Sequence, residues 1–288
     1  EFYEKIRGRK LLGIKFKAIE VCRKLDMEVI LVTTLMRGFN DKEVGRIVRF
    51  AAANSDIIRG LIFQPIAFTG RATDNPYKDA WRDWRFAEEV ESQTGGEILT
   101  TDFFPMSVMT SPIKIMRKFM RKPWPLFSCS PHCGIVNWMY VSKSGKIIPI
   151  NHFVNFKTFF NLTLKTAQGV ETKSKLQLLA SLFIAATLSL NMALVTKEVG
   201  VFSLMKSIMK MYVAPSYDSL GPIRRRIFLL GCMAFMDQYN FDVNRVRRCV
   251  IHYVTPRMKV IPFCAYNNIH RIETEEEYAL KQNSQNSR

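Results

Sequence analysis

The sequence predicts an α/β fold in its N-terminal part, followed by a region of helices and β-hairpins. Two apolar, β-branched runs, "EVILVTTLM" and "DIIRGLIFQPIAFTG", are typical of buried parallel strands. Apolar residues at helical spacing mark helices in "IKFKAIEVCRKLD" and "NDKEVGRIVRFAAAN". Helix, strand, helix and strand follow one another within about 60 residues, an order that indicates part of a parallel barrel or of an open sheet.

Each of these elements has a local justification. The first helix has an apolar face with lysines between its members, and a second helix can be capped by Asn40 or Asp41. A polar helix over about 77–92 is expected to end at the Gly95-Gly96 pair. Loops at the carboxyl ends of parallel strands carry the chemistry of such folds, and here those loops are "TTLMRGFND" and "QPIAFTGR". The apolar face of the first helix consists of Ile14, Ala18, Val21, Cys22 and Leu25.

Two segments later in the chain predict β-hairpins that resemble each other. "GIVNWMYVSKSGKIIPINHF" has its turn at Ser144-Gly145, and "CVIHYVTPRMKVIPFCAYN" turns around Pro256. Aligning the "IIP" of the first with the "VIP" of the second also superimposes Tyr140 on Tyr253, and it matches Asn151 with Cys264. Duplication, convergent use of one cluster-binding hairpin, and chance can each explain so short a match.

The segment between the hairpins is predicted to be helical over about 157–214. No charged residue occurs in 176–196, a length that reaches the roughly 20 residues of a membrane span. Polar residues dilute this run, so a helix that is buried or dips into a surface is favoured over a span. The next stretch, "VFSLMKSIMKMYV", has its two lysines on one face, which fits either a membrane-surface helix or an ordinary packed helix.

The chain is strongly basic, with a net charge of +17 over 288 residues. Such an excess favours an anionic partner: nucleic acid, phospholipid headgroups or a phosphorylated substrate. The basic clusters "RKFMRK", "GPIRRR" and "RVRR" have no aromatic residues interleaved in the pattern of RNA-binding modules, so nucleic acid is not the expected partner. No secretory signal opens the sequence, and a cytoplasmic location is expected, with a position at the membrane surface as a further expectation.

Six cysteines are too few for a disulfide-stapled secreted scaffold, and in a reducing compartment they favour metal binding. Cys22, on a helix face, is predicted to be a core residue. The other five can supply the four thiolates of an iron–sulfur cluster or of a zinc site, and scattered buried thiols are the alternative. His132 is a further possible ligand. The five cysteines are Cys129, Cys133, Cys232, Cys249 and Cys264.

The sequence resembles the C-terminal half of a radical S-adenosylmethionine enzyme. The helix–strand–helix segment "IKFKAIEVCRKLDMEVILVTTLMRGFNDKEVGRIVRFA" and the strand "IRGLIFQPIAFTGR" resemble late elements of that partial barrel. "PHCG", "SLGPIRRRIFLLGCMAFMDQYNFDVNRVRRCVIHYVTP" and "IPFCAYN" look like archaeal tetraether lipid synthases. The fold class that follows is α/β: the C-terminal part of a partial (β/α)6 barrel, then a helical and β-hairpin region that holds an auxiliary iron–sulfur cluster.

The resemblance implies cofactors, ligands and a substrate. The cofactors are a [4Fe–4S] cluster and S-adenosylmethionine, with Cys232, Cys249 and Cys264 as cluster ligands and Cys133 or Cys129 as the fourth. Residues at the ends of the two strands are implied to face the S-adenosylmethionine pocket. The implied reaction joins two lipid tails of an archaeal phospholipid, an anionic substrate, through a new carbon–carbon bond. The pocket residues are Thr34, Asn40, Gln64 and Pro65.

Departures from the family pattern limit what this chain is expected to do alone. The C-x₃-C-x₂-C motif that binds the catalytic cluster is absent. We therefore expect a fragment, a degenerate copy or one half of a split enzyme, inactive until it meets a missing N-terminal half or a full-length parent. Alternatives are a radical S-adenosylmethionine enzyme acting on a peptide or pterin precursor, and a non-catalytic, metal-stabilised protein that binds nucleic acid.

Five segments follow from this interpretation. Residues 1–112 are the barrel portion, and 113–156 are a basic linker with the first cysteine hairpin. Residues 157–216 form the apolar helical region. The auxiliary-cluster hairpin occupies 217–274, and 275–288 form a polar tail expected to be frayed.

Overall fold

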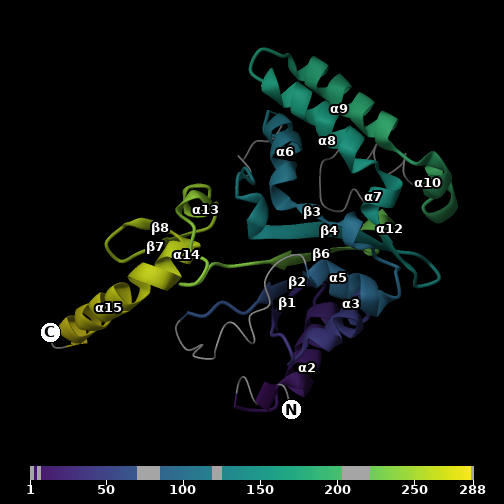
Figure 1. Ribbon diagram of the computed structural model, residues 1–288. Coiled ribbons are helices and arrows are strands. Elements are labelled where there is room, and N and C mark those ends of the chain that lie inside the picture. Colours follow the sequence, from purple (N-terminus) through teal and green to yellow (C-terminus); the bar gives the residue numbers. More distant parts are fainter. Residues whose placement is uncertain (1–2, 5–7, 70–84, 119–124, 203–220, 287–288) are drawn as a thin grey trace.

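The computed structural model describes residues 3–4, 8–69, 85–118, 125–202 and 221–286 (Figure 1). Within them, a six-stranded mixed sheet runs in the order β1-β2-β6-β4-β3, and β5 pairs with the C-terminal part of β4. The α/β fold predicted from the sequence is therefore confirmed. The strands of the sheet are β1 (Val29–Leu35), β2 (Ile58–Pro65), β3 (Phe104–Pro105), β4 (Gly134–Val141), β5 (Ile147–Pro149) and β6 (Ile227–Met233).

Three strands of the sheet are parallel. β1 pairs with β2 and β2 pairs with β6 in parallel, whereas β4 runs antiparallel to β6, β3 and β5. The sheet therefore combines strands from the predicted barrel portion, the first hairpin and the region after residue 217. Glycines allow β6 and β4 to approach closely, because a Cβ built at Gly231 would lie 2.6 Å from Cγ1 of Val136.

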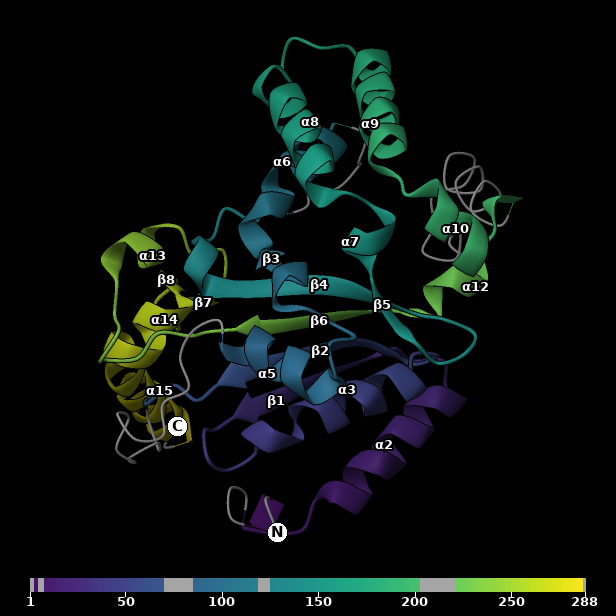
Figure 2. The same ribbon diagram turned by 45° about the vertical axis from the view of Figure 1, so that its right-hand side comes forward.

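Helices cover one face of the parallel strands. α3 (Val44–Ala53) and α5 (Arg85–Thr94) pack together and against this face, with 3₁₀ turn η1 (Asp41–Glu43) leading into α3 (Figure 2). Their apolar sides join Leu61 and Phe63 of β2 in the main core. The other face is more open: Ile30 and Val32 of β1 are 63% and 55% exposed.

The apolar face predicted for the first helix is mostly exposed, which corrects the sequence prediction. In α2 (Leu12–Lys24) only Ile19 is buried, and Cys22 is half-buried rather than a core residue. Phe16 makes a ring contact with Phe50 of α3, with 5.5 Å between the ring centroids. Spacing alone predicted a helix correctly, but it could not reveal that little of the described chain packs against that face.

A helical layer lies beyond the β3–β4 edge of the sheet (Figure 2). α8 packs against α6 and α9, and the helix α9 ends where Leu190 forms a bridge with Val154. The uncharged run is thus divided between α9 and α10, and among the described residues no helix is both long and apolar enough to cross a membrane. "VFSLMKSIMKMYV" lies almost wholly outside the described residues. The layer consists of η2 (Thr100–Asp102), η3 (Met106–Met109), α6 (Thr110–Met116), α7 (Ile150–Phe153), α8 (Phe156–Gln168), α9 (Lys175–Ser189) and α10 (Met192–Glu198).

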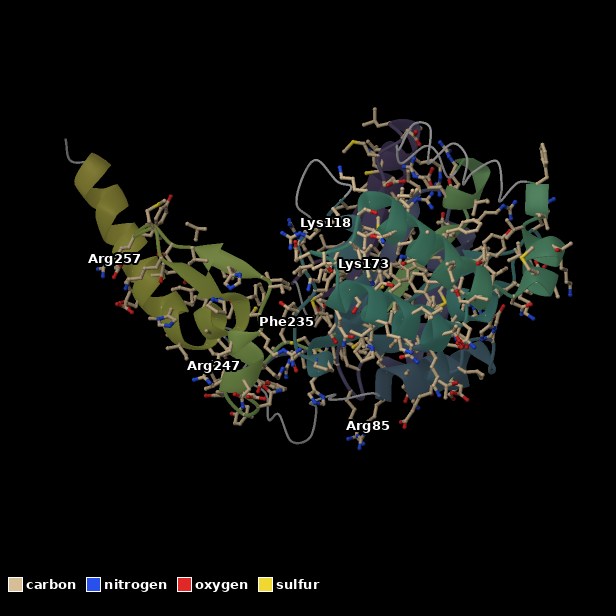
Figure 3. The ribbon with its side chains drawn as sticks, turned by 90° about the horizontal axis from the view of Figure 1, so that it is seen from above. Arg85, Lys118, Lys173, Phe235, Arg247 and Arg257 are labelled. Carbon is tan, nitrogen blue, oxygen red and sulfur yellow. The ribbon has the colours of Figure 1, made fainter. Side chains whose placement is uncertain are left out.

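The C-terminal part of the chain forms a unit that projects from the sheet (Figures 1 and 3). Figure 3 shows Phe235 where this unit meets the rest of the molecule. The predicted frayed tail belongs instead to a helix, and Arg257 of the hairpin turn forms an ion pair with Glu277 of that helix. The unit follows α12 (Gly221–Arg224) and β6, and it contains α13 (Val243–Arg247), β7 (His252–Val254), β8 (Val260–Pro262), α14 (Phe263–Ala265), η6 (Tyr266–His270) and α15 (Arg271–Asn286).

Both predicted hairpins form, and they share one register. Tyr140 lies opposite Ile148 in the first hairpin, as Tyr253 lies opposite Ile261 in the second. Each returning strand ends at a proline that begins a short helix, α7 or α14. The sequence match is thus a match of structure, and it sets Asn151 and Cys264 at equivalent places after their hairpins.

Candidate functional site

A cavity of about 270 Å³ lies at the carboxyl ends of β1 and β2. Thr34, Gln64 and Pro65, three of the four residues expected to face a cofactor pocket, line it together. Thr34 and Gln64 are register partners on adjacent parallel strands, so their side chains share one face of the sheet. The segment after β6 and the C-terminal unit complete the wall with Phe235, Met236, Phe263, Cys264 and Asn267.

Asn40, the fourth predicted pocket residue, builds the loop beside the cavity instead of lining it. Its Nδ2 donates to the carbonyl of Thr34 (2.8 Å), and its Oδ1 accepts from the backbone N–H of Met36 (2.8 Å). The Asp41 carboxylate accepts from the backbone N–H of Gly38 at 2.9 Å, where Gly38 has a left-handed φ of 70°. The G-x-N-D element thus fixes the course of the chain after β1.

Four of the five candidate thiols lie near one another beside this cavity. Burial first, and then the neighbouring thiol of Cys133, raises the pKa of the Cys129 thiol, and Cys249 adds to the effect. Burial also raises the pKa of Cys264, with smaller upward contributions from Cys249 and Cys133. Thiols that act on one another in this way occupy a common neighbourhood. All six cysteines are free thiols, so none of them closes a disulfide.

Hydrogen-bond donors are already arranged around these sulfurs. The backbone N–H of Met236 donates to Sγ of Cys264 at 3.4 Å and lowers its pKa in part. Arg245 extends one guanidinium nitrogen to the carbonyl of Ala234 (2.8 Å), and the same nitrogen lies 3.8 Å from Sγ of Cys133. The Nε of Arg245 is buried and has no hydrogen-bond partner among the described residues. A half-buried cation with a free N–H fits a group that becomes anionic on metal binding.

Arg248 closes the same region by donating to the carbonyl of Ser128 at 3.2 Å. Arginines of "RVRR" therefore contact the thiol region rather than forming only a surface charge cluster. Those of "GPIRRR" are likewise engaged: Arg224 pairs with Glu28, and Arg225 with Asp26. The sequence offered one signal for Arg245, its place four residues before Cys249, but charge alone could not distinguish this role from a solvated face.

Cys232 packs in the main core and does not line the cavity at the strand ends. In the parallel register it lies opposite Phe63, on the face covered by α3 and α5, and its side chain belongs to the main core. Burial raises the pKa of its thiol to about 12. Thr34 and Gln64 lie on the other face, because side chains alternate along a strand.

A single metal ion does not fit these residues as they stand. Among the described residues no group of three or more His, Cys, Asp or Glu side chains is close enough to hold one ion. An iron–sulfur cluster spans several atoms, so its ligands stand farther apart than those of one ion, and its usual ligands are thiolates with nearby N–H donors. His132 is exposed, in the turn η4 (Pro131–Cys133), and its backbone N–H donates to Ser130 Oγ at 3.4 Å.

Comparison with known proteins gives one strong match. No family model matches the chain. Over 279 residues, 95% of the chain, it is 37% identical to a protein of Methanocaldococcus jannaschii named 7,8-dihydro-6-hydroxymethylpterin dimethyltransferase. The chain spans 55% of that relative's length. The relative's name describes an enzyme, as expected, but it does not describe a tetraether lipid synthase.

Proposed function

We propose that this chain is the cofactor-pocket and auxiliary-cluster portion of a radical S-adenosylmethionine enzyme. The observation that carries the proposal is the cavity in which two parallel-strand ends, Thr34 and Gln64, meet a thiol of the neighbouring group, Cys264. The sequence resemblance and the methyltransferase name of the relative agree with it. In α/β folds, ligands bind at the carboxyl ends of parallel strands, where this cavity lies.

The proposed cofactors are S-adenosylmethionine and a [4Fe–4S] cluster. Cys129, Cys133, Cys249 and Cys264 would hold the cluster, which supplies one-electron chemistry when bound. Arg245 offsets the negative charge of the thiolates, and the backbone N–H of Met236 donates to one of them. Cys232 is left out of the ligand set because it faces the helix-covered core.

The cavity side chains can position two ligands in contact. Thr34 and Gln64 offer polar groups at one wall for S-adenosylmethionine. Phe235, which follows β6, and Phe263, which begins α14, add an aromatic pair to the lining, with 4.6 Å between their ring centroids. Asn267 stands beside them, and its Nδ2 donates to the carbonyl of Phe263 (2.9 Å), which leaves its oxygen for a ligand donor.

This aromatic pair favours a reduced pterin as the substrate, the class named for the relative. A flat bicyclic ring stacks on aromatic side chains, and its ring N–H groups require acceptors such as the oxygen of Asn267. A pterin precursor was one of the alternatives at the sequence level, and the relative's name favours it over lipid tails.

A lipid-tail substrate is the second candidate, and one observation supports it. α9 exposes several large apolar side chains, including Leu176 at 77%, Phe183 at 59% and Leu188 at 67% exposed. Exposed apolar area of this kind fits a lipid surface or tail. Peripheral association of the chain with membranes belongs to this second candidate.

Titration of the full chain with a reduced pterin and with phospholipid vesicles distinguishes the two candidates. For a pterin, Phe263→Ala weakens binding by up to roughly tenfold, since a stacked ring contributes about 0.5–1.5 kcal/mol, and Leu176→Ser has no effect. For lipid, Leu176→Ser weakens vesicle binding and Phe263→Ala does not. If neither the pterin nor the vesicles bind, both substrate assignments are refuted.

Metal analysis after anaerobic reconstitution tests the cluster separately. About four iron and four sulfide per chain are expected. Cys249→Ala and Cys264→Ala should lose most of this iron, whereas Cys22→Ala, which changes a half-buried thiol on α2, is the matched control. Full iron content in both variants would refute the ligand assignment without bearing on the substrate.

We also propose that the remainder of the enzyme covers the open face of the parallel strands. β1 is an edge strand of the sheet, and Ile30 and Val32 expose apolar surface there. In a closed parallel barrel this face would be interior. Supplying the missing half should reduce hydrogen exchange of β1 amides and enable S-adenosylmethionine cleavage, which we do not expect from the chain alone.

A further inference from the structure

A second, larger cavity of about 600 Å³ lies beyond the β3–β4 edge of the sheet, under the helical layer. Its walls come from η2, β3, α7, the beginning of α8 and the segment at the end of α9. None of its lining residues belongs to the cavity beside the thiols. The proposed function therefore makes no use of it.

The structural repeat relates the two cavities. Asn151, which follows the first hairpin, lines the larger cavity, and its counterpart Cys264, which follows the second hairpin, lines the smaller one. The repeated strand–strand–helix unit thus places a polar amide side chain in one cavity and a thiol in the other. In the first unit the next residue is His152, which also lines its cavity.

His152 is held by a buried carboxylate. Its Nε2 lies 2.8 Å from Oδ1 of Asp102, whose side chain is 3% exposed, whereas that of His152 is 40% exposed. The same carboxylate accepts from Nδ2 of Asn151 (2.7 Å) and from the backbone N–H of Leu99 (2.8 Å). An ionised carboxylate only accepts hydrogen bonds, so Nε2 carries the proton and Nδ1 of the imidazole is left for a ligand.

The unsatisfied charge in this cavity is positive. Among the lining residues the titratable side chains are Asp102, His152 and Lys157. Asp102 is occupied by its three donors, and no carboxylate pairs with Lys157 within the described parts of the chain. Lys157 lies in the first turn of the 13-residue helix α8, where the helix dipole adds to the attraction for an anion.

Other lining residues are aromatic or aliphatic. Phe104 and Phe156 meet edge to face with 4.8 Å between their centroids, and Leu188 and Leu190 add aliphatic side chains. The cavity is therefore lined both by cationic and hydrogen-bonding groups and by apolar ones.

We propose that this cavity binds a phosphate monoester carried on an aromatic or apolar body. Lys157 and a protonated His152 contact the phosphate oxygens, and Asp102 stabilises the imidazolium that forms. Phe156 and Phe104 pack against the body of the ligand. A soluble phosphomonoester and a phospholipid headgroup share this chemistry.

Calorimetric titration of the full chain with phenyl phosphate and inorganic phosphate tests the assignment. Phenyl phosphate should bind more tightly, and Phe156→Leu should reduce that preference while leaving inorganic phosphate binding unchanged. His152→Gln and Lys157→Ala should each weaken binding of both probes roughly tenfold or more, since each removes a charge-assisted hydrogen bond to the phosphate. Lys165→Ala, which removes an exposed lysine at the other end of the same helix, is the matched control and should change nothing.

Imidazole NMR of the wild-type chain supplies a second readout, for which the His152→Gln variant serves only to assign the resonance. The chain has four histidines, so the His152 resonance can be assigned by its loss in His152→Gln protein. Either phosphate probe should shift that resonance. Vesicles that contain phosphatidic acid, whose binding is lost in the His152 and Lys157 variants, would assign the same chemistry to a lipid headgroup. Failure of all three probes to bind, or binding that both variants leave unchanged, would overturn the proposal.

Discussion

Replacing Cys232 with alanine should separate the core thiol from the four thiols proposed to bind the cluster. Cys232 is 6% exposed and packs in the main core, where burial raises the pKa of its thiol from 9.0 to about 12. As the pH rises past about 9, the thiol of the unfolded chain ionises and that of the folded chain does not. The unfolded state then binds fewer protons, so the free energy of unfolding falls with increasing pH.

The slope gives the size of the effect. A difference of one bound proton changes stability by about 1.4 kcal/mol per pH unit between the two pKa values. Near pH 10.5 the wild-type chain should therefore lose roughly 2 kcal/mol from this thiol alone. Cys232→Ala lacks that loss, but near pH 8 it should be less stable than wild type by roughly 1 kcal/mol, because removal of the sulfur leaves a small void.

Urea denaturation of both proteins near pH 8 and pH 10.5, under anaerobic and reducing conditions, measures how the stability difference between variant and wild type changes with pH. Other titrating groups cancel because the two chains share them. The order of stability should reverse between the two pH values, and the variant should retain its iron after reconstitution. A stability deficit that is independent of pH would refute the core assignment of Cys232, and loss of iron would return it to the ligand set.

Three further predictions follow from individual contacts. Met258→Gly should raise stability by up to about 1 kcal/mol in thermal or urea melts, because Met258 has a left-handed φ of 59° with its side chain 81% exposed; a loss of stability would contradict this. Gly231→Ala should cost about 1–3 kcal/mol through the close approach of β4, and Val136→Ala should recover part of that cost in the double variant; strict additivity would exclude the contact. Arg245→Met should raise the pKa of Cys264 and slow its alkylation in metal-free protein, since the Arg245 charge lowers that pKa; an unchanged pH profile would exclude the interaction.

Local sequence patterns correctly predicted the strands, helices and hairpins that depend mainly on residues close together in the chain. The β1 and β2 runs, the α3 helix and the two hairpins all form close to their expected positions. The turn of the second hairpin lacks a glycine, and Met258 takes the left-handed conformation that Gly145 takes in the first. Sequence likeness between the hairpins therefore identified a repeated unit even where the turn residue differs.

What the sequence did not reveal depends on contacts between distant segments. The strand β6 comes from a short apolar run, and nothing in the run indicates that it inserts between β2 and β4. The face of the sheet on which Cys232 lies follows from its register with Phe63. The sequence alone does not give this strand pairing, so it could not separate Cys232 from the other candidate ligands. The Asp102–His152 pair joins residues 50 positions apart and was not anticipated for the same reason.

The position of β6 in the sheet has a consequence for how the chain reaches its native state. β6 is flanked by β2, which ends at Pro65, and by β4, which begins at Gly134, yet β6 itself begins only at Ile227. Until β6 is synthesised, the edge of β2 and the edge of β4 that will pair with it both remain unpaired. High contact order of this kind slows folding, because the entropy of closing long loops is lost before the sheet forms. The nascent chain therefore presents two unpaired strand edges until β6 has been synthesised, a period in which chaperone binding would protect it from aggregation.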